Sequence, residues 1–353
     1  MFIKKYEIHY DPEVGRTTIN SNKNNTMEKN LLLIISIAII FTSCKNNVPT
    51  INYAHGLPGE IVVVMSNERW NSESGNILKA VLATESETLP MEEPLFALHQ
   101  IEKSEFNQIN MLHRNIIFQE INSNIEQSYI KLIKDKYAKN QSFIHIIAKN
   151  QTEFVKIVLE HKDELIDIFL TNERNQFLKQ FEKYNNKPAA KKLSARYSIN
   201  MIIPQNFTLD VENENFAWLS KETKKYTMNI LVYTYPLTDS TELTAQYLIE
   251  KRNEVVKENI PGENDGSYMT TETKYNYPTF TLSKHKKLDT GILQGLWKVH
   301  GDFMGGGFVS YSKIDRPRNR VVTVEGFVYY PNHEMRDLIR ELDAILYTFD
   351  FVF

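Results

Sequence analysis

The stretch IVVVM, residues 61–65, is a continuous apolar run of strand length, which is typical of a strand buried on both faces. Strand-like and helix-like segments alternate after it: residues 76–83 (helix), 115–121 (strand), 123–133 (helix), 143–148 (strand) and 150–184 (helix, with a break near residues 171–174). Ser123 with Glu126, and Asn150 with Glu153, have the spacing of helix-opening capping boxes. This alternation predicts an N-terminal α/β-like domain over residues 59–186.

The sequence pattern changes after residues 187–196. This polar segment contains Pro188, and we interpret it as a linker. Residues 197–353 contain strand-like runs rich in Tyr, Thr, Val and Ile: 197–203, 226–235, 268–275, 293–300, 308–312, 320–330 and 347–353. Two helices are expected among them, one from near Asp239 and one from Asn332. The pattern predicts an antiparallel sheet with packed helices, and therefore an α+β chain of two sheet-and-helix domains.

The N-terminal region contains a targeting signal. Residues 27–43 combine a short basic start at Lys29 with an apolar stretch, residues 31–40, that is too short to span a bilayer. Two small residues then precede Cys44, which predicts a lipoprotein signal peptide and lipidation of Cys44. Residues 1–26 have no structural period and are interpreted as an over-extended start, with a cytoplasmic leader as the alternative; residues 44–58 read as a tether.

Composition limits the possible partners. The chain has 41 basic and 44 acidic residues, so no charge excess argues for nucleic acid. Cys44 is the only cysteine, which excludes an intrachain disulfide framework, a thiolate zinc site and, once it is lipidated, a cysteine nucleophile. The expected partner is a membrane, contacted through the lipid anchor.

Motifs of catalysis are missing from the sequence. No His-Glu-x-x-His string, Gly-x-Ser-x-Gly elbow or phosphate loop occurs, and three Ser-x-x-Lys matches are about what chance gives. Glu92-Glu93 lies between prolines and reads as a loop. We therefore assign no catalytic residue, no metal site and no cofactor.

Two sets of residues are candidates for binding. The first is Trp297, Phe303, Met304, Gly305, Gly306, Gly307 and Phe308. The glycines are expected in a hairpin or bulge, and large apolar residues beside a flexible turn are typical of a contact patch. The alternative is that Trp297 and Phe308 point into the core. The second set is Arg316, Arg318 and Arg114, which form either an anion clamp or solvated turns.

Four short motifs occur in an order that resembles an uncharacterised lipoprotein family of Bacteroidetes-type Gram-negative bacteria. They are Gly56-x-Pro58-Gly59-Glu60, Trp70, Leu89-Pro90 with Glu93-Pro94-Leu95-Phe96, and His113-Arg114-Asn115-Ile116. The resemblance extends through residues 297–307 and Tyr330-Pro331, and it implies an envelope lipoprotein with no assigned activity. By looser analogy, the C-terminal order of elements is similar to the α/β/α sandwich of photosystem-associated and nuclear-transport factors.

These observations predict a non-enzymatic binding or assembly module that faces the periplasm, anchored to a bacterial membrane, most simply the outer one. Its partner would be an envelope protein or a small ligand. The alternative is an envelope hydrolase whose active-site residues are dispersed along the chain.

Overall fold

The computed structural model describes residues 52–86, 88–238 and 242–352. These residues belong to one compact unit that begins at residue 51. Cys44, the signal peptide and most of the tether lie outside the described residues. The described part contains two large sheets with packed helices, so the α+β prediction is confirmed.

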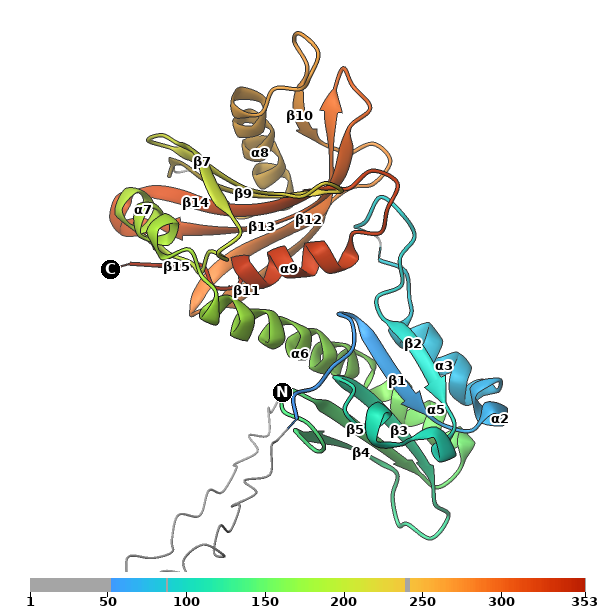
Figure 1. Ribbon diagram of the computed structural model, residues 1–353. Helices are drawn as coiled ribbons and strands as arrows, with labels where there is room; N and C mark the ends of the chain where they lie inside the picture. The colour runs from blue at the N-terminus through green and yellow to red at the C-terminus, as the bar shows by residue number, and fades with distance from the viewer. Residues whose placement is uncertain (1–51, 87, 239–241, 353) are drawn as a thin grey trace, which may run out of the picture. The chain divides into compact units, whose positions relative to one another are not determined.

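The first sheet has the strand order β2-β1-β3-β5-β4. Its strands are β1 (Glu60–Val64), β2 (Ala97–Ile101), β3 (Asn115–Ile121), β4 (Tyr129–Lys134) and β5 (Ser142–Ala148). The helices of this half are α2 (Asn67–Trp70), α3 (Glu73–Leu82), α4 (Gln108–Met111), α5 (Gln151–Glu160) and α6 (Lys162–Lys183). β1, β2, β3 and β5 are parallel neighbours, and β4 is an antiparallel edge strand (Figure 1).

The predicted run 61–65 coincides with β1, an interior strand between β2 and β3. Ile61 and Val63 pack with α3, α5 and α6 on one face, whereas Val62 and Val64 pack with an aromatic cluster on the other. A strand buried on both faces needs apolar side chains at every position, which explains the unbroken IVVVM pattern.

Two predictions for this half are wrong. Residues 123–133 do not form a helix, because β4 pairs with the free edge of β5 from Tyr129 to Lys134. The three-residue spacing of the half-buried Ile130 and Ile133 is typical of a helix, and pairing with β5 overrides this local pattern. The expected helix break near residues 171–174 instead falls at His161, between α5 and α6.

The second sheet is antiparallel, with the order β10-β12-β13-β14-β9-β8-β7, and β11 also pairs with β12. Its strands are β7 (Thr208–Glu212), β8 (Phe216–Glu222), β9 (Thr227–Pro236), β10 (Tyr268–Thr271), β11 (Thr279–His285), β12 (Leu288–His300), β13 (Gly305–Asp315) and β14 (Arg320–Tyr329). A two-stranded ladder joins β6 (Ile199–Asn200) to β15 (Asp350–Phe351).

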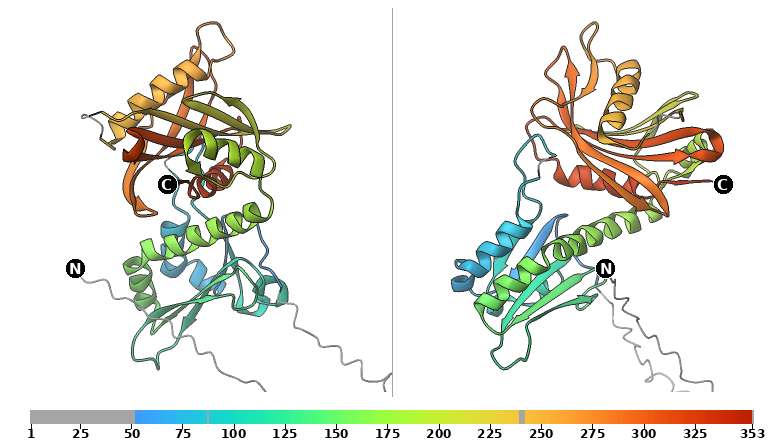
Figure 2. Two further views of the ribbon diagram at one scale, coloured as in Figure 1. Left: turned by 90° about the vertical axis from the view of Figure 1, so that its left-hand side faces the viewer. Right: turned by 180° about the vertical axis from the view of Figure 1, so that it is seen from behind.

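Helices cover both faces of this sheet (Figure 2). The helix α8 (Ala245–Asn259) packs on one face with Leu231, Phe308 and Phe327, and the helices α7 (Lys187–Tyr197) and α9 (Arg336–Leu346) pack on the other with Ile230 and Val309. The sheet has the alternating inward and outward side chains that its strands require. The face that carries α8 is called the α8 face below.

The predicted linker is in fact helix α7. Asn186 caps it by accepting the backbone N–H of Ala189, and Pro188 is tolerated because it lies in the first turn. Leu193 and Tyr197 are buried four residues apart on one side of the helix. The segment is therefore a packed element and not an open connection.

Helix starts in this half also differ from their predictions. α8 begins after Thr244, whose hydroxyl accepts the N–H of Tyr247, while Asp239 lies outside the described residues. α9 begins at Arg336 rather than at Asn332. The expected strands at 197–203 and 347–353 reduce to the short β6 and β15.

Candidate functional site

A cavity of about 530 Å³ opens on the α8 face of the second sheet. It crosses the sheet from β7 to β10, and the loop that follows α8, residues 260–263, forms one wall. Its large apolar lining residues are Trp218, Ile260, Met269, Trp297, Val299, Met304, Phe327 and Tyr329. We call this the tryptophan cavity. Its volume lies in the range of small-molecule sites.

Trp297 forms the floor of the cavity, and its indole passes over the neighbouring strand β13. Trp297 on β12 lies opposite Gly306 on β13, and its indole reaches across β13 to donate from Nε1 to the carbonyl of Val328 on β14, at 3.1 Å. A Cβ atom at Gly306 would lie 2.1 Å from that carbonyl and 2.9 Å from the indole nitrogen. Gly306 is therefore the residue that makes room for the indole.

The register explains why the carbonyl is available. β13 pairs with β14 only from Phe308 onward, opposite Phe327. Gly305, Gly306 and Gly307 lie within strand β13 and pair with β12, whereas the turn between the two strands is formed by residues 301–304. The glycines were expected in a hairpin or bulge. They lie in the β12–β13 hairpin, but in its second strand and not in its turn, and Gly306 leaves room for the indole of Trp297.

Trp218 forms the opposite side of the cavity. Its indole Nε1 donates to Oδ1 of Asn229, at 2.9 Å, and the Asn229 amide nitrogen donates to Thr227. The indole of Trp218 and the ring of Phe327 lie 6.4 Å apart, and Phe327 also meets Trp297 edge-on at 5.5 Å. The three rings thus form a continuous aromatic floor.

A buried ion pair supports this floor from the side of α8. Arg252 donates from Nε and Nη2 to the two oxygens of Glu325, at 3.0 and 2.8 Å, and from Nη1 to Thr271. The Arg252 guanidinium also stacks over the Phe308 ring at 4.0 Å. Both charged side chains are at most 1% exposed. Such a fully hydrogen-bonded pair fixes the register of its surroundings, and we assign it a structural role.

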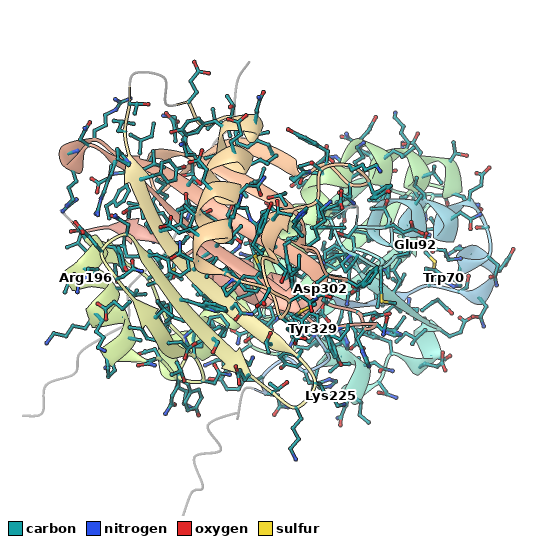
Figure 3. All side chains as sticks on the ribbon, turned by 90° about the horizontal axis from the view of Figure 1, so that it is seen from above. Trp70, Glu92, Arg196, Lys225, Asp302 and Tyr329 are labelled. Carbon is teal, nitrogen blue, oxygen red and sulfur yellow. The ribbon has the colours of Figure 1, made fainter. Side chains whose placement is uncertain are left out.

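The polar rim of the cavity is acidic. Asp210, Glu222 and Glu263 line it, and lysine, arginine and histidine do not occur among the described residues that line it. All three carboxylates are exposed, and none forms an ion pair with a described residue. Figure 3 shows this face of the sheet, with Tyr329 on β14, Asp302 in the turn before β13, and Lys225 in the turn between β8 and β9.

The residues that the sequence suggested for binding do not all lie in one place in the structure. Trp297 and Met304 line the tryptophan cavity, and Gly306 shapes its floor. Phe308 is buried beneath Arg252, and Phe303 is fully exposed in the turn, outside the lining. Sequence analysis missed Trp218, Asn229 and Phe327, which only the register of distant strands brings to the same place.

In the turn at residues 316–320, two of the three arginines contact groups of the protein itself. Arg318 and Arg320 both contact the carboxylate of Asp315, which is buried, and Arg318 also donates to the carbonyl of Val352. Arg316 is exposed and borders a separate hollow of about 260 Å³. Two of the three guanidinium groups in this turn are therefore occupied within the protein.

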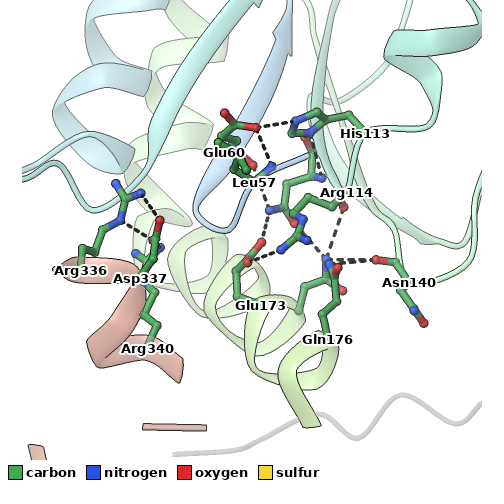
Figure 4. Close-up of polar contacts among 12 residues, drawn as sticks. Leu57, Glu60, His113, Arg114, Asn140, Glu173, Gln176, Arg336, Asp337 and Arg340 are labelled. Carbon is green, nitrogen blue, oxygen red and sulfur yellow. Dashed lines mark hydrogen bonds and ion pairs between the residues drawn. The ribbon is translucent and has the colours of Figure 1, made fainter. Parts of the chain in front are cut away.

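Arg114 has an internal partner as well. Its Nη1 donates to Glu173 on α6 at 2.8 Å, and the other oxygen of Glu173 accepts from Asn115 at 2.6 Å (Figure 4). Glu60 in turn accepts from the backbone of Leu57 and lies 3.3 Å from His113. Although burial alone would raise the pKa of Glu60, these hydrogen bonds lower it.

Glu93 and Pro94, from the third sequence motif, contact α9. The two carboxylate oxygens of Glu93 accept the N–H groups of Met335 and Arg336, at 2.8 and 2.9 Å, and burial raises the pKa of Glu93 against these bonds. Arg336 also donates to the carbonyl of Pro94. Motifs that are far apart in the sequence thus join the N-terminal half to the last helix.

Among the described residues, no group of three or more His, Cys, Asp and Glu side chains could hold a metal ion. None of the described helices is both long and apolar enough to cross a bilayer.

Comparison with known proteins finds two domains of unknown function. Residues 54–182 match DUF8532, and residues 186–348 match DUF4837. No curated protein matches the chain.

Solved structures give low similarity. The Ran-binding protein Mog1p of Saccharomyces cerevisiae has a TM-score of 0.29 and 9% identity, over 44% of this chain and 90% of that one. A point mutant of the protein Mog1 has a TM-score of 0.30 and 9% identity, over 44% of this chain and 91% of that one.

Proposed function

We propose that this chain is a lipid-anchored binding protein of the cell envelope, and that the tryptophan cavity holds an apolar or aromatic part of its ligand. The observation that carries the proposal is the aromatic floor, in which Trp218, Phe327 and Trp297 lie side by side under a cavity of about 530 Å³. Pockets lined by aromatic side chains with a few polar groups are the common form of ligand sites.

Binding is favoured over catalysis by the lining itself. Reactions of acyl or phosphoryl transfer use a nucleophile beside a base, with histidine the most frequent base. The described residues that line the tryptophan cavity offer carboxylates, hydroxyls and an amide at the edge of an apolar floor. This composition suits recognition of a ligand better than its transformation.

A neutral fluorescent probe tests the cavity. N-phenyl-1-naphthylamine should bind the soluble protein that lacks residues 1–44, with a rise in probe emission that saturates. Ser220, which lines the cavity from β8, offers a matched pair of variants. Ser220→Phe should fill the space and reduce binding at least tenfold, whereas Ser220→Ala should bind as the wild type does. Equal binding by both variants would place the probe elsewhere.

The anchor rests on Cys44, the cysteine that follows the apolar stretch. Two or three acyl chains hold a protein stably at a membrane, whereas one does so only marginally. Cells that express the full chain should incorporate an alkyne palmitate into the wild type and not into Cys44→Ala. Equal labelling of the two proteins would remove the anchor from the proposal.

A further inference from the structure

The two indole N–H groups on the cavity floor already have acceptors within the protein. The indole N–H of Trp297 is bound to Val328, and the indole N–H of Trp218 is bound to Asn229. The Asn229 amide nitrogen donates one hydrogen bond to the hydroxyl of Thr227. A ligand therefore meets the rings of the two indoles and not their N–H groups.

The rim, by contrast, supplies negative charge from three separate elements. Asp210 comes from β7, Glu222 from β8, and Glu263 from the loop that follows α8. Lys224 and Lys225 lie in the turn after Glu222 and do not belong to the lining. The carboxylates thus stand near the same apolar floor without a described cation to neutralise them.

On β8, the alternation of side chains separates Glu222 from the adjacent basic residue. On β8, Lys221 points to the opposite face, where its Nζ lies 2.9 Å from Glu341 of α9, while Ser220 and Glu222 line the cavity. On β7, the register shifts between Leu209 and Val211, so that Asp210 is the inserted residue of a bulge. A bulge redirects side chains, and here Asp210 and Val211 both line the cavity.

Two half-buried acids of this half form ion pairs. Glu212, two residues after Asp210, lies within 4.0 Å of Lys192 and 3.6 Å of Arg196, and Glu272 pairs with Lys298 at 2.9 Å. The three rim carboxylates differ from other exposed acids, such as Glu214, by their position beside the aromatic floor. Indole faces attract cations through the ring quadrupole, and nearby carboxylates add to that attraction.

We infer that the tryptophan cavity selects a cationic amphiphile, a small molecule that carries an ammonium group next to an apolar tail. This inference rests on the proposed binding function and adds the charge of the ligand to it. The tail packs on the aromatic floor, and the ammonium group lies among the indole faces and the three rim carboxylates.

Three probes with the same six-carbon tail test this charge selection: hexyltrimethylammonium, hexan-1-ol and hexane-1-sulfonate. Binding is followed by tryptophan fluorescence in Trp70→Phe protein, because Trp70 is the one tryptophan outside the cavity. At low salt the cation should bind about tenfold more tightly than the alcohol, the sulfonate should bind least, and the preference should shrink at high salt.

A matched pair of triple variants assigns the preference to the rim. Asp210→Asn, Glu222→Gln and Glu263→Gln together should reduce binding of the cation to the level of the alcohol. Glu214→Gln, Glu258→Gln and Asp265→Asn change the net charge equally at exposed positions outside the lining, and they should leave the preference intact. Equal loss in both triple variants would mean that overall charge, and not this rim, selects the ligand.

The outcomes separate the two proposals. If the alcohol binds and the cation binds no better, the cavity is a binding site but the charge selection is wrong. If the sulfonate binds best, the charge selection is also wrong. If no probe binds, while N-phenyl-1-naphthylamine also fails to bind, the proposed function fails and the inference fails with it.

Discussion

Gly306 determines where the indole of Trp297 can lie. An alanine at this position would place its Cβ 2.1 Å from the Val328 carbonyl oxygen, which neither side of the contact can accommodate without a backbone shift. We expect Gly306→Ala to lower the free energy of unfolding by about 2–3 kcal/mol, as overpacking does. Tryptophan emission should also change as the indole is displaced.

Gly307 is the control for this change. Its Cβ would meet the side chain of Ile339 at 3.2 Å, and a side chain can give way. Gly307→Ala should therefore cost less than about 1 kcal/mol in the same urea titration. Equal losses for the two variants would show that the glycines matter through strand propensity and not through the crossing of the indole.

His285 gives the fold a measurable dependence on pH. Burial, together with the charges of Lys313 and Lys286, lowers its pKa to about 4, while Asp350 acts in the opposite direction. Tyr311 and Tyr347 pack against its ring. Because the unfolded group titrates near pH 6.5, the unfolded chain binds a proton between pH 6.5 and 4 that the folded chain does not bind.

The stability that neutral His285 contributes is thus complete above pH 6.5 and is lost as the pH falls toward 4. The loss at pH 4 is on the order of 3 kcal/mol. His285→Phe keeps a ring in place and removes the titration. Urea unfolding at pH 7.5 and pH 4.5 should show a smaller pH effect in this variant than in the wild type; the same difference in both would contradict the assignment.

At the scale of elements, α9 depends on a cap from a distant loop. Glu93 accepts two N–H groups at the start of the helix, and its negative charge lies at the positive end of the helix dipole. Glu93→Gln keeps the shape but removes the charge and one acceptor, so it should cost about 1–2 kcal/mol in thermal unfolding.

Glu92 is the natural comparison, because it is the adjacent carboxylate and is exposed. Glu92→Gln should leave the melting temperature within about 1 °C of the wild type, as surface changes do. A cap of minor importance would instead give two variants that melt together.

Elements were predictable where the local sequence pattern was compatible with only one type of secondary structure. β3 matches the predicted run 115–121, and Asn150 caps α5 through Glu153, as its spacing indicates. The segment of β4 was predicted as part of a helix, and the segment of α7 was predicted as a linker. For β4 the free edge of β5 decides the state, and for α7 the burial of Leu193 and Tyr197 does so. Neither neighbour is visible in the local sequence.

At the scale of the whole molecule, the pairing of strands brings the residues of the candidate site together from distant parts of the sequence. Trp297 and Met304 were identified from their composition and their glycine neighbours. Trp218 lies on β8 and Phe327 on β14, which are far apart in the sequence. The strand order β12-β13-β14-β9-β8 brings them together. The acidic rim could not be predicted either, because it depends on a bulge in β7 and on a loop after α8.

The central claim is that the two tryptophans floor a ligand site. The most direct measurement is quenching of their fluorescence by a neutral bromoalkane alcohol, 6-bromohexan-1-ol, in Trp70→Phe protein. If the account is correct, quenching saturates with ligand concentration, and Ser220→Phe weakens it at least tenfold. Quenching that rises linearly without saturation, and equally in Ser220→Phe, would show only collisions with solvent and would contradict the claim.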